Sequence, residues 1–93
     1  MPMARPSHLI VVEIAERFRR AKGKDISRNN GALARLLEAV NGALVELQTK
    51  EETEIRVPSI ASDRVGALHL HFKLSREDAV QIGGVRSIEQ LLD

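Results

Sequence analysis

Cysteine, tryptophan and tyrosine are absent from this chain of 93 residues, and its only aromatic side chains are two phenylalanines. Without thiols the chain can form neither disulfides nor thiolate metal sites, and this composition fits a cytoplasmic location. Few aromatic rings are available for stacking on unpaired bases, so the usual route to single-strand nucleic-acid recognition is poorly supplied.

Neither sign of charge dominates, because 14 lysines and arginines face 13 acidic residues and the net charge is +1. A balanced chain creates no global field that attracts nucleic acid or anionic lipid. No apolar run approaches the roughly 18 residues of a membrane span, and "LIVV" (9–12) is too short for a signal peptide. We therefore expect a small soluble protein that does not enter a membrane.

The length of the chain suits a single domain. Residues 1–6, "MPMARP", have no periodicity and are predicted to form a flexible arm, with one α+β domain over residues 7–93. A domain of this size buries only about 60–65% of the surface of its unfolded chain. We therefore expect self-association to add to its small core.

Two amphipathic helices are predicted in the first half of the chain. Apolar residues recur with helical spacing between Ser7, the expected N-cap, and Gly23, the expected stop. A second helix is predicted over residues 32–48, with Asn29 or Asn30 as its N-cap.

A two-stranded antiparallel hairpin follows, because apolar and polar residues alternate in 54–61 and 67–74 around a turn at 62–66. Pro58 lacks an N–H and predicts an edge strand or a bulge at that point. The register that buries one face pairs Val57 with Leu70, Ile55 with Phe72, Glu54 with Lys73 and Arg56 with His71.

One or two short helices are predicted at the C-terminal end. "SRED" is a capping box that begins at Ser75, and the helix that it starts should reach Ile82. Glycines 83–84 interrupt it, and Ser87 is the expected cap of a last helical turn. The predicted fold class is α+β: two N-terminal helices, the hairpin, and these C-terminal pieces.

His69 and His71 lie two residues apart on one strand and therefore project from the same face. A zinc site needs a third ligand, and the predicted register places the guanidinium of Arg56, which repels a divalent cation, opposite His71. We therefore interpret the two imidazoles as the solvated side of an amphipathic strand and predict no metal ligand.

The segment 17–28 is basic and could contact phosphates. Arg17 and Arg20 each follow a glutamate by four residues, which favours an ion pair on a helix. The basic residues left without such a partner, and therefore the candidate phosphate contacts, are Arg19, Lys22, Lys24 and Arg28.

A stripe of leucine and valine along the second helix is the candidate interface between protein chains. Its spacing of four and three residues resembles a heptad rhythm, but it is too short to argue for a coiled coil. The residues of the candidate interface are Leu33, Leu37, Val40, Leu44 and Leu47.

Short catalytic motifs are missing: the sequence has no G-x-S-x-G, no phosphate loop and no H-E-x-x-H. We therefore predict that the protein is not an enzyme and has no catalytic residues and no cofactor. The predicted function is a protein–protein interaction module that forms a homo-oligomer or binds a protein partner through the leucine stripe or the hairpin edge. The alternative is weak binding of the nucleic-acid backbone by the basic segment.

Overall fold

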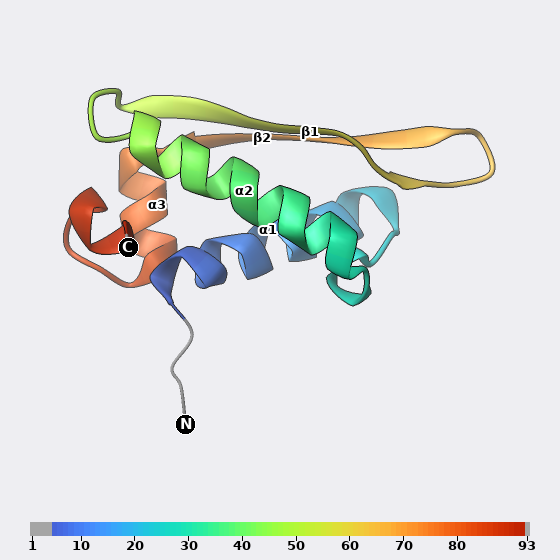
Figure 1. Ribbon diagram of the computed structural model, residues 1–93, viewed down its shortest axis with the longest axis horizontal. Helices are drawn as coiled ribbons and strands as arrows, with labels where there is room; N and C mark the ends of the chain where they lie inside the picture. Colours follow the sequence, from blue (N-terminus) through green and yellow to red (C-terminus); the bar gives the residue numbers. More distant parts are fainter. Residues whose placement is uncertain (1–4, 93) are drawn as a thin grey trace.

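A computed structural model describes residues 5–92, in which a layer of helices lies against one face of a two-stranded sheet (Figure 1). With η marking a short 3₁₀ helix, the elements are α1 (Pro6–Lys22), η1 (Ile26–Arg28), α2 (Asn30–Glu46), β1 (Glu52–Ser62), β2 (Ala67–Ser75), α3 (Arg76–Gly83) and η2 (Ile88–Leu91). The predicted α+β class and the order of its elements are confirmed. The domain boundary proposed at residue 7 stays a prediction, and residues 1–4 of the expected arm lie outside the described residues.

The start of α1 differs from the prediction and its end agrees with it. Pro6 occupies the first turn, where its fixed φ suits a helix, so Arg5 becomes the N-cap residue, and its side chain makes no capping bond to the helix. Ser7, the predicted cap, lies inside the helix and is only 1% exposed, so that assignment is wrong. Gly23 ends the helix as predicted: its φ is 73° and its N–H donates to the carbonyl of Arg19 over 2.8 Å.

The connection between the two helices contains a structured turn that periodicity did not predict. The carboxylate of Asp25 accepts the N–H of Ser27 over 3.0 Å and thereby starts η1, which buries Ile26. Asn29 then caps α2, because its side-chain oxygen accepts the N–H of Ala32 over 2.9 Å. One of the two expected caps of α2 is thus confirmed.

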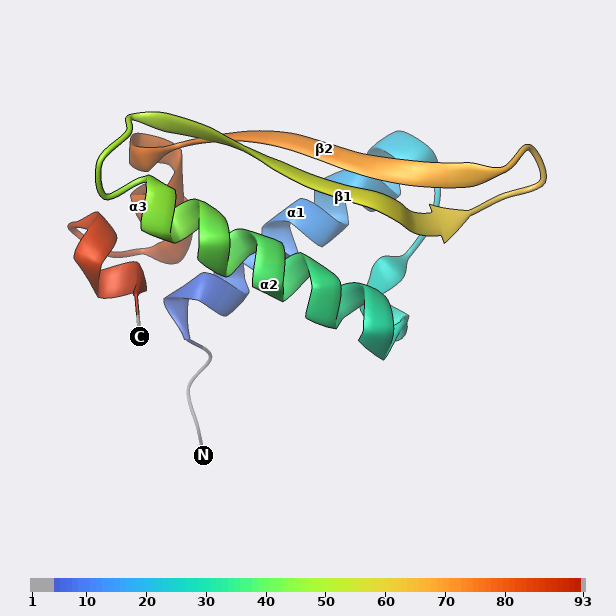
Figure 2. The same ribbon diagram turned by 45° about the horizontal axis from the view of Figure 1, so that its top comes forward.

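The hairpin has the predicted register throughout its inner part, with Val57 opposite Leu70 and Ile55 opposite Phe72. A bulge interrupts the pairing between Val57 and Ala61, as Pro58 indicated, and Ser59 within it has a φ of 51°. The hairpin lies close to α2 where β1 begins and diverges from it toward the tip, which projects past the helices (Figure 2).

A single apolar core joins all of these elements. The leucines of α2 and the inward face of the hairpin belong to one cluster, which confirms that the two apolar stripes share an interior. Side chains of this cluster with no exposed surface include Ile10, Leu36, Val40, Leu44, Leu47 and Leu74.

The C-terminal end of the described chain is helical in two pieces. The hydroxyl of Ser75 accepts the N–H of Asp78 over 2.9 Å, which confirms Ser75 as the N-cap and thus one of the two bonds of the predicted capping box. Ser87 is the N-cap residue of η2, as predicted, but its side chain makes no capping bond. Gln90 instead reaches back, and its side-chain oxygen accepts the N–H of Arg86 over 2.7 Å.

Candidate functional site

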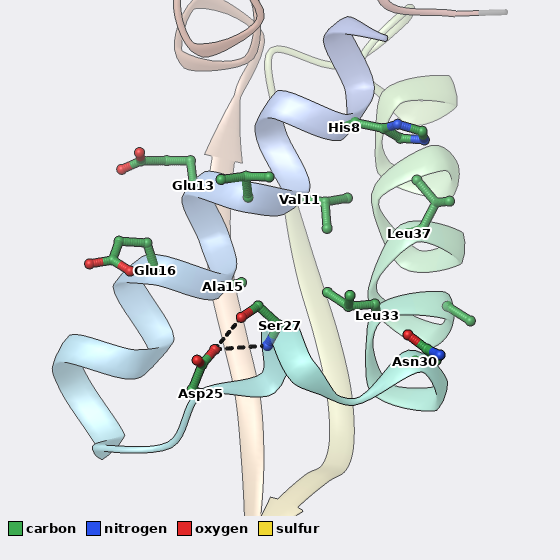
Figure 3. A pocket seen from close by; sticks show the side chains of 12 residues that line it. His8, Val11, Glu13, Ala15, Glu16, Asp25, Ser27, Asn30, Leu33 and Leu37 are labelled. Atoms are coloured by element: carbon green, nitrogen blue, oxygen red, sulfur yellow. Dashed lines mark hydrogen bonds between the residues drawn. The ribbon is translucent and has the colours of Figure 1, made fainter. Parts of the chain in front are cut away.

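A groove of about 760 Å³ opens between α1 and α2 on the side away from the hairpin (Figure 3). Its floor is apolar because Val11 and Ala15 of α1 face Leu33 and Leu37 of α2. His8 lies at one end of the groove and points toward α2. An apolar floor with a polar rim suits contact with protein side chains better than contact with a highly charged ligand.

The carboxylates around this groove are engaged with their own neighbours. Asp25 accepts hydrogen bonds from the hydroxyl and then from the backbone N–H of Ser27, which hold the pKa of its carboxyl below the usual value. The pKa of Glu16 is also lowered, chiefly by its hydrogen bond from Arg19 and secondarily by Arg20. The carboxylates of Glu16 and Asp25 are therefore ionised, and each is also paired with arginine on its own segment.

Both histidines of the hairpin point to solvent as predicted, but each makes a hydrogen bond that the sequence did not indicate. The Nδ1 atom of His69 accepts the N–H of Ser59 over 2.8 Å. The Nε2 atom of His71 lies 3.0 Å from the carboxylate of Glu54. Within residues 5–92 no three metal-ligating side chains are grouped to hold an ion, and the absence of a metal site stays a prediction.

Glu54 is shared between two cationic groups on the exposed face of the hairpin. Its carboxylate lies 3.0 Å from the guanidinium of Arg56 and 3.0 Å from the ring of His71. The hydrogen bond from His71 and then that from Arg56 lower the pKa of Glu54. Arg56, whose guanidinium was predicted to repel a cation near His71, therefore contacts the same Glu54 carboxylate as His71.

Two of the four candidate phosphate contacts are already in ion pairs. Arg19, expected to be unpaired, contacts Glu16 over 2.6 Å, because residues three apart also share a helix face. Arg28 lies 3.7 Å from Asp25. In the described part of the chain, only Lys22 and Lys24 of this set have no ion pair, which is fewer than the predicted cluster required.

The candidate interface on α2 divides into two parts. Val40, Leu44 and Leu47 have no exposed surface, because this chain's own hairpin and helices cover them. They cannot contact a second protein in this conformation, so their assignment to an interface is corrected. Leu33 and Leu37 are half-buried and line the groove, and for them the assignment stays a proposal.

Two arginines hold distant segments together, and the sequence did not single out either of them. Arg76, at the start of α3, donates to the carbonyls of Leu47 over 2.8 Å and Lys50 over 2.9 Å. Arg35 of α2 donates to two carbonyls in the bulge of β1. Their acceptors lie more than 20 residues away in the sequence, so local spacing carries no signal for either contact.

The helix pair, the hairpin and the following helix together match a family of molecular chaperones. Residues 7–83, from the first turn of α1 to the end of α3, match the model described as "Hsp70 protein". The chain is 35% identical over 77 residues to the heat shock protein hsp-6 of Caenorhabditis elegans, a match that covers 83% of this chain and 12% of hsp-6. The chain therefore belongs to the Hsp70 family.

This assignment corrects the function predicted from the sequence. The Hsp70 family is one of ATPase chaperones, so the interpretations as a non-enzymatic interaction module and as a nucleic-acid binder are wrong. The likeness to the family is spread over 77 residues and is not concentrated in a short motif. No helix within residues 5–92 is both long and apolar enough to cross a membrane.

Proposed function

We propose that this chain acts as one lobe of an Hsp70-type ATPase chaperone and supplies a scaffold for its ATPase domain. The observation that carries the proposal is the extent of the match, which runs without a gap over every element from α1 to α3. The chain spans about an eighth of the length of hsp-6. ATP as substrate and client polypeptides as partners are thus proposals for the assembled protein.

The α1–α2 groove supports a packing role within such an assembly. Its floor of valine, alanine and leucine side chains can lose water to an apolar surface at little cost. The side chains that line the groove include carboxylates but no lysine or arginine, so the groove supplies no lysine or arginine to pair with a phosphate. We infer that other segments of an Hsp70-type domain contact the groove and that the phosphates of ATP bind elsewhere. A cytoplasmic location remains part of the proposal, supported by the cysteine-free sequence.

A chimera tests whether the chain can take the place of the Hsp70 lobe. Residues 7–83 replace the matching segment of hsp-6, and ATP hydrolysis and thermal unfolding are measured. We expect one cooperative transition and hydrolysis above that of a matched chimera carrying Leu36→Asp, which places a charge at a core position with no exposed surface. A folded chimera whose hydrolysis equals that of the Leu36→Asp control would contradict the proposal.

A further inference from the structure

Residues 84–92 lie beyond the Hsp70-matched residues, yet they close one end of the apolar core. Ile88 is 5% exposed and Leu91 is 2% exposed. In Figure 1 the segment turns back beside α3, and its last described residues approach the start of α1. The core of this chain is therefore completed by residues outside the family match.

A glycine pair makes this reversal possible. Gly84 has a φ of 68°, a left-handed conformation that glycine adopts without a steric penalty. The reversal is held by backbone bonds, because the N–H of Val85 donates to the carbonyl of Val80 over 3.0 Å and that of Gly84 to Gln81 over 3.3 Å. The chain can thus leave α3 and return along it within a few residues.

The other glycine of the pair provides the space into which the returning segment packs. A Cβ atom placed on Gly83 would lie 2.5 Å from Cδ2 of Leu91 and 3.5 Å from the Cβ of Pro6. Leu91 therefore occupies the place where any other residue at position 83 would carry its side chain. This contact joins the end of α3, the start of α1 and the segment 84–92 at one point.

The attachment of the segment depends on few bonds. The 3₁₀ helix η2 has only four residues, and Ser87 makes no side-chain bond at its start. Beside Leu91 and Leu92, the exposed Val45 and Asn41 of α2 leave a hollow of about 380 Å³. Segments with few contacts at the edge of a core open at lower free energy than the core itself.

We propose that residues 84–92 form a strap that closes the α1–α3 end of the Hsp70-matched unit and opens separately from it. Opening uncovers the apolar surface around Gly83 that Leu91 covers, while α1, α2 and the hairpin remain folded. The proposal takes only the boundary at residue 83 from the family match and does not depend on ATPase activity.

The lack of cysteine allows a direct test by thiol labelling, since each engineered cysteine is the only one in its chain. Ile88→Cys reports on the strap, Leu36→Cys reports on the body, and the exposed Gln90→Cys sets the unprotected rate. The strap is loosened by Gly83→Ala, whose added Cβ displaces Leu91. Gly42→Ala, which meets nothing within 4 Å in the middle of α2, is the matched control.

In the native background we expect Ile88→Cys to react about ten times more slowly than Gln90→Cys, and Leu36→Cys more slowly still. Adding Gly83→Ala should bring the rate of Ile88→Cys to within about three times that of Gln90→Cys and leave Leu36→Cys unchanged. Gly42→Ala should alter neither reporter. If Leu36→Cys accelerates together with Ile88→Cys, or if Gly83→Ala leaves Ile88→Cys protected, there is no separately opening strap.

Discussion

The hairpin consists of an inner and an outer half that are stabilised in different ways. In the inner half, residues 52–57 pair regularly with 70–75, and alternate side chains are buried against the helices. In the outer half, beyond the bulge at 58–60, the strands meet again at Ala61 and Leu68 and then reach an exposed tip where Val65 is 96% exposed.

Polar contacts hold the outer half where apolar packing is thin. The guanidinium of Arg35 donates to the carbonyls of Pro58 over 2.5 Å and Ser59 over 3.2 Å, and the N–H of Ser59 donates to His69. At the tip, the carboxylate of Asp63 accepts two backbone N–H groups. Burial therefore sets the register of the inner half, and specific hydrogen bonds set the shape of the outer half.

The largest difference between the two halves should come from truncating one leucine in each. Leu74→Ala removes an inner side chain with no exposed surface and should lower the free energy of unfolding by about 2–5 kcal/mol. Leu68→Ala removes a half-buried outer side chain and should cost less than half as much. Urea unfolding followed by circular dichroism measures both, and equal losses would remove the distinction between the halves.

Arg35→Ala tests whether the outer half depends on its polar contacts. It leaves two carbonyls of the bulge without this donor and should lower the free energy of unfolding by about 1–2 kcal/mol. In this variant, amide hydrogen exchange should accelerate more in residues 58–68 than in residues 52–57. Arg64→Ala, at the exposed tip, is the control and should change stability by less than about 0.5 kcal/mol. If Arg35→Ala is as silent as this control, the contacts of Arg35 do not hold the bulge.

Glycine substitutions in β1 should have opposite effects inside and outside the bulge. Ser59 has a φ of 51°, so Ser59→Gly should raise the free energy of unfolding by about 0.5–1 kcal/mol while keeping the backbone bond to His69. Ser62→Gly, at a paired strand position, should lower it by a similar amount of about 0.5–1 kcal/mol. Thermal unfolding of both variants gives the two signs, and a shared sign would show that Ser59 is not strained.

The smallest expected effect concerns the pH dependence of the inner half. The pKa of Glu54 is lowered in the folded chain by His71 and Arg56, so its stabilising contribution is present above the ordinary carboxyl pKa. That contribution is lost as the pH falls through the lowered folded value. Glu54→Gln should therefore make the free energy of unfolding depend less on pH on the acid side than Glu38→Gln, the control on α2. Urea unfolding at a series of pH values measures both variants. Identical profiles for the two variants would contradict this linkage.

The parts of the fold that follow from local patterns were predictable. The helix stop at Gly23, the caps at Asn29 and Ser75 and the inner hairpin register all depend on residues near one another in the sequence or on two-residue alternation. The cap assigned to Ser7 failed because the neighbouring proline starts the helix earlier.

The candidate site was less predictable, because its contacts join distant segments. The sequence identified Leu33 and Leu37 as apolar but could not separate them from Val40 and Leu44, which are fully buried in the core. Arg19 was predicted to be unpaired from the four-residue spacing, whereas its ion pair with Glu16 spans three residues. Membership of the Hsp70 family was not predicted, because none of the short motifs considered identifies the family.

The sequence by itself determined which side of each helix and strand is apolar, because side-chain direction repeats with a fixed period along a helix or a strand. Only the tertiary structure decided which apolar residues remain accessible and which carbonyls receive Arg35 and Arg76. It also decided that Leu91 fills the space at Gly83. These outcomes depend on how elements that are distant in the sequence pack against one another, and local sequence patterns do not reveal that packing.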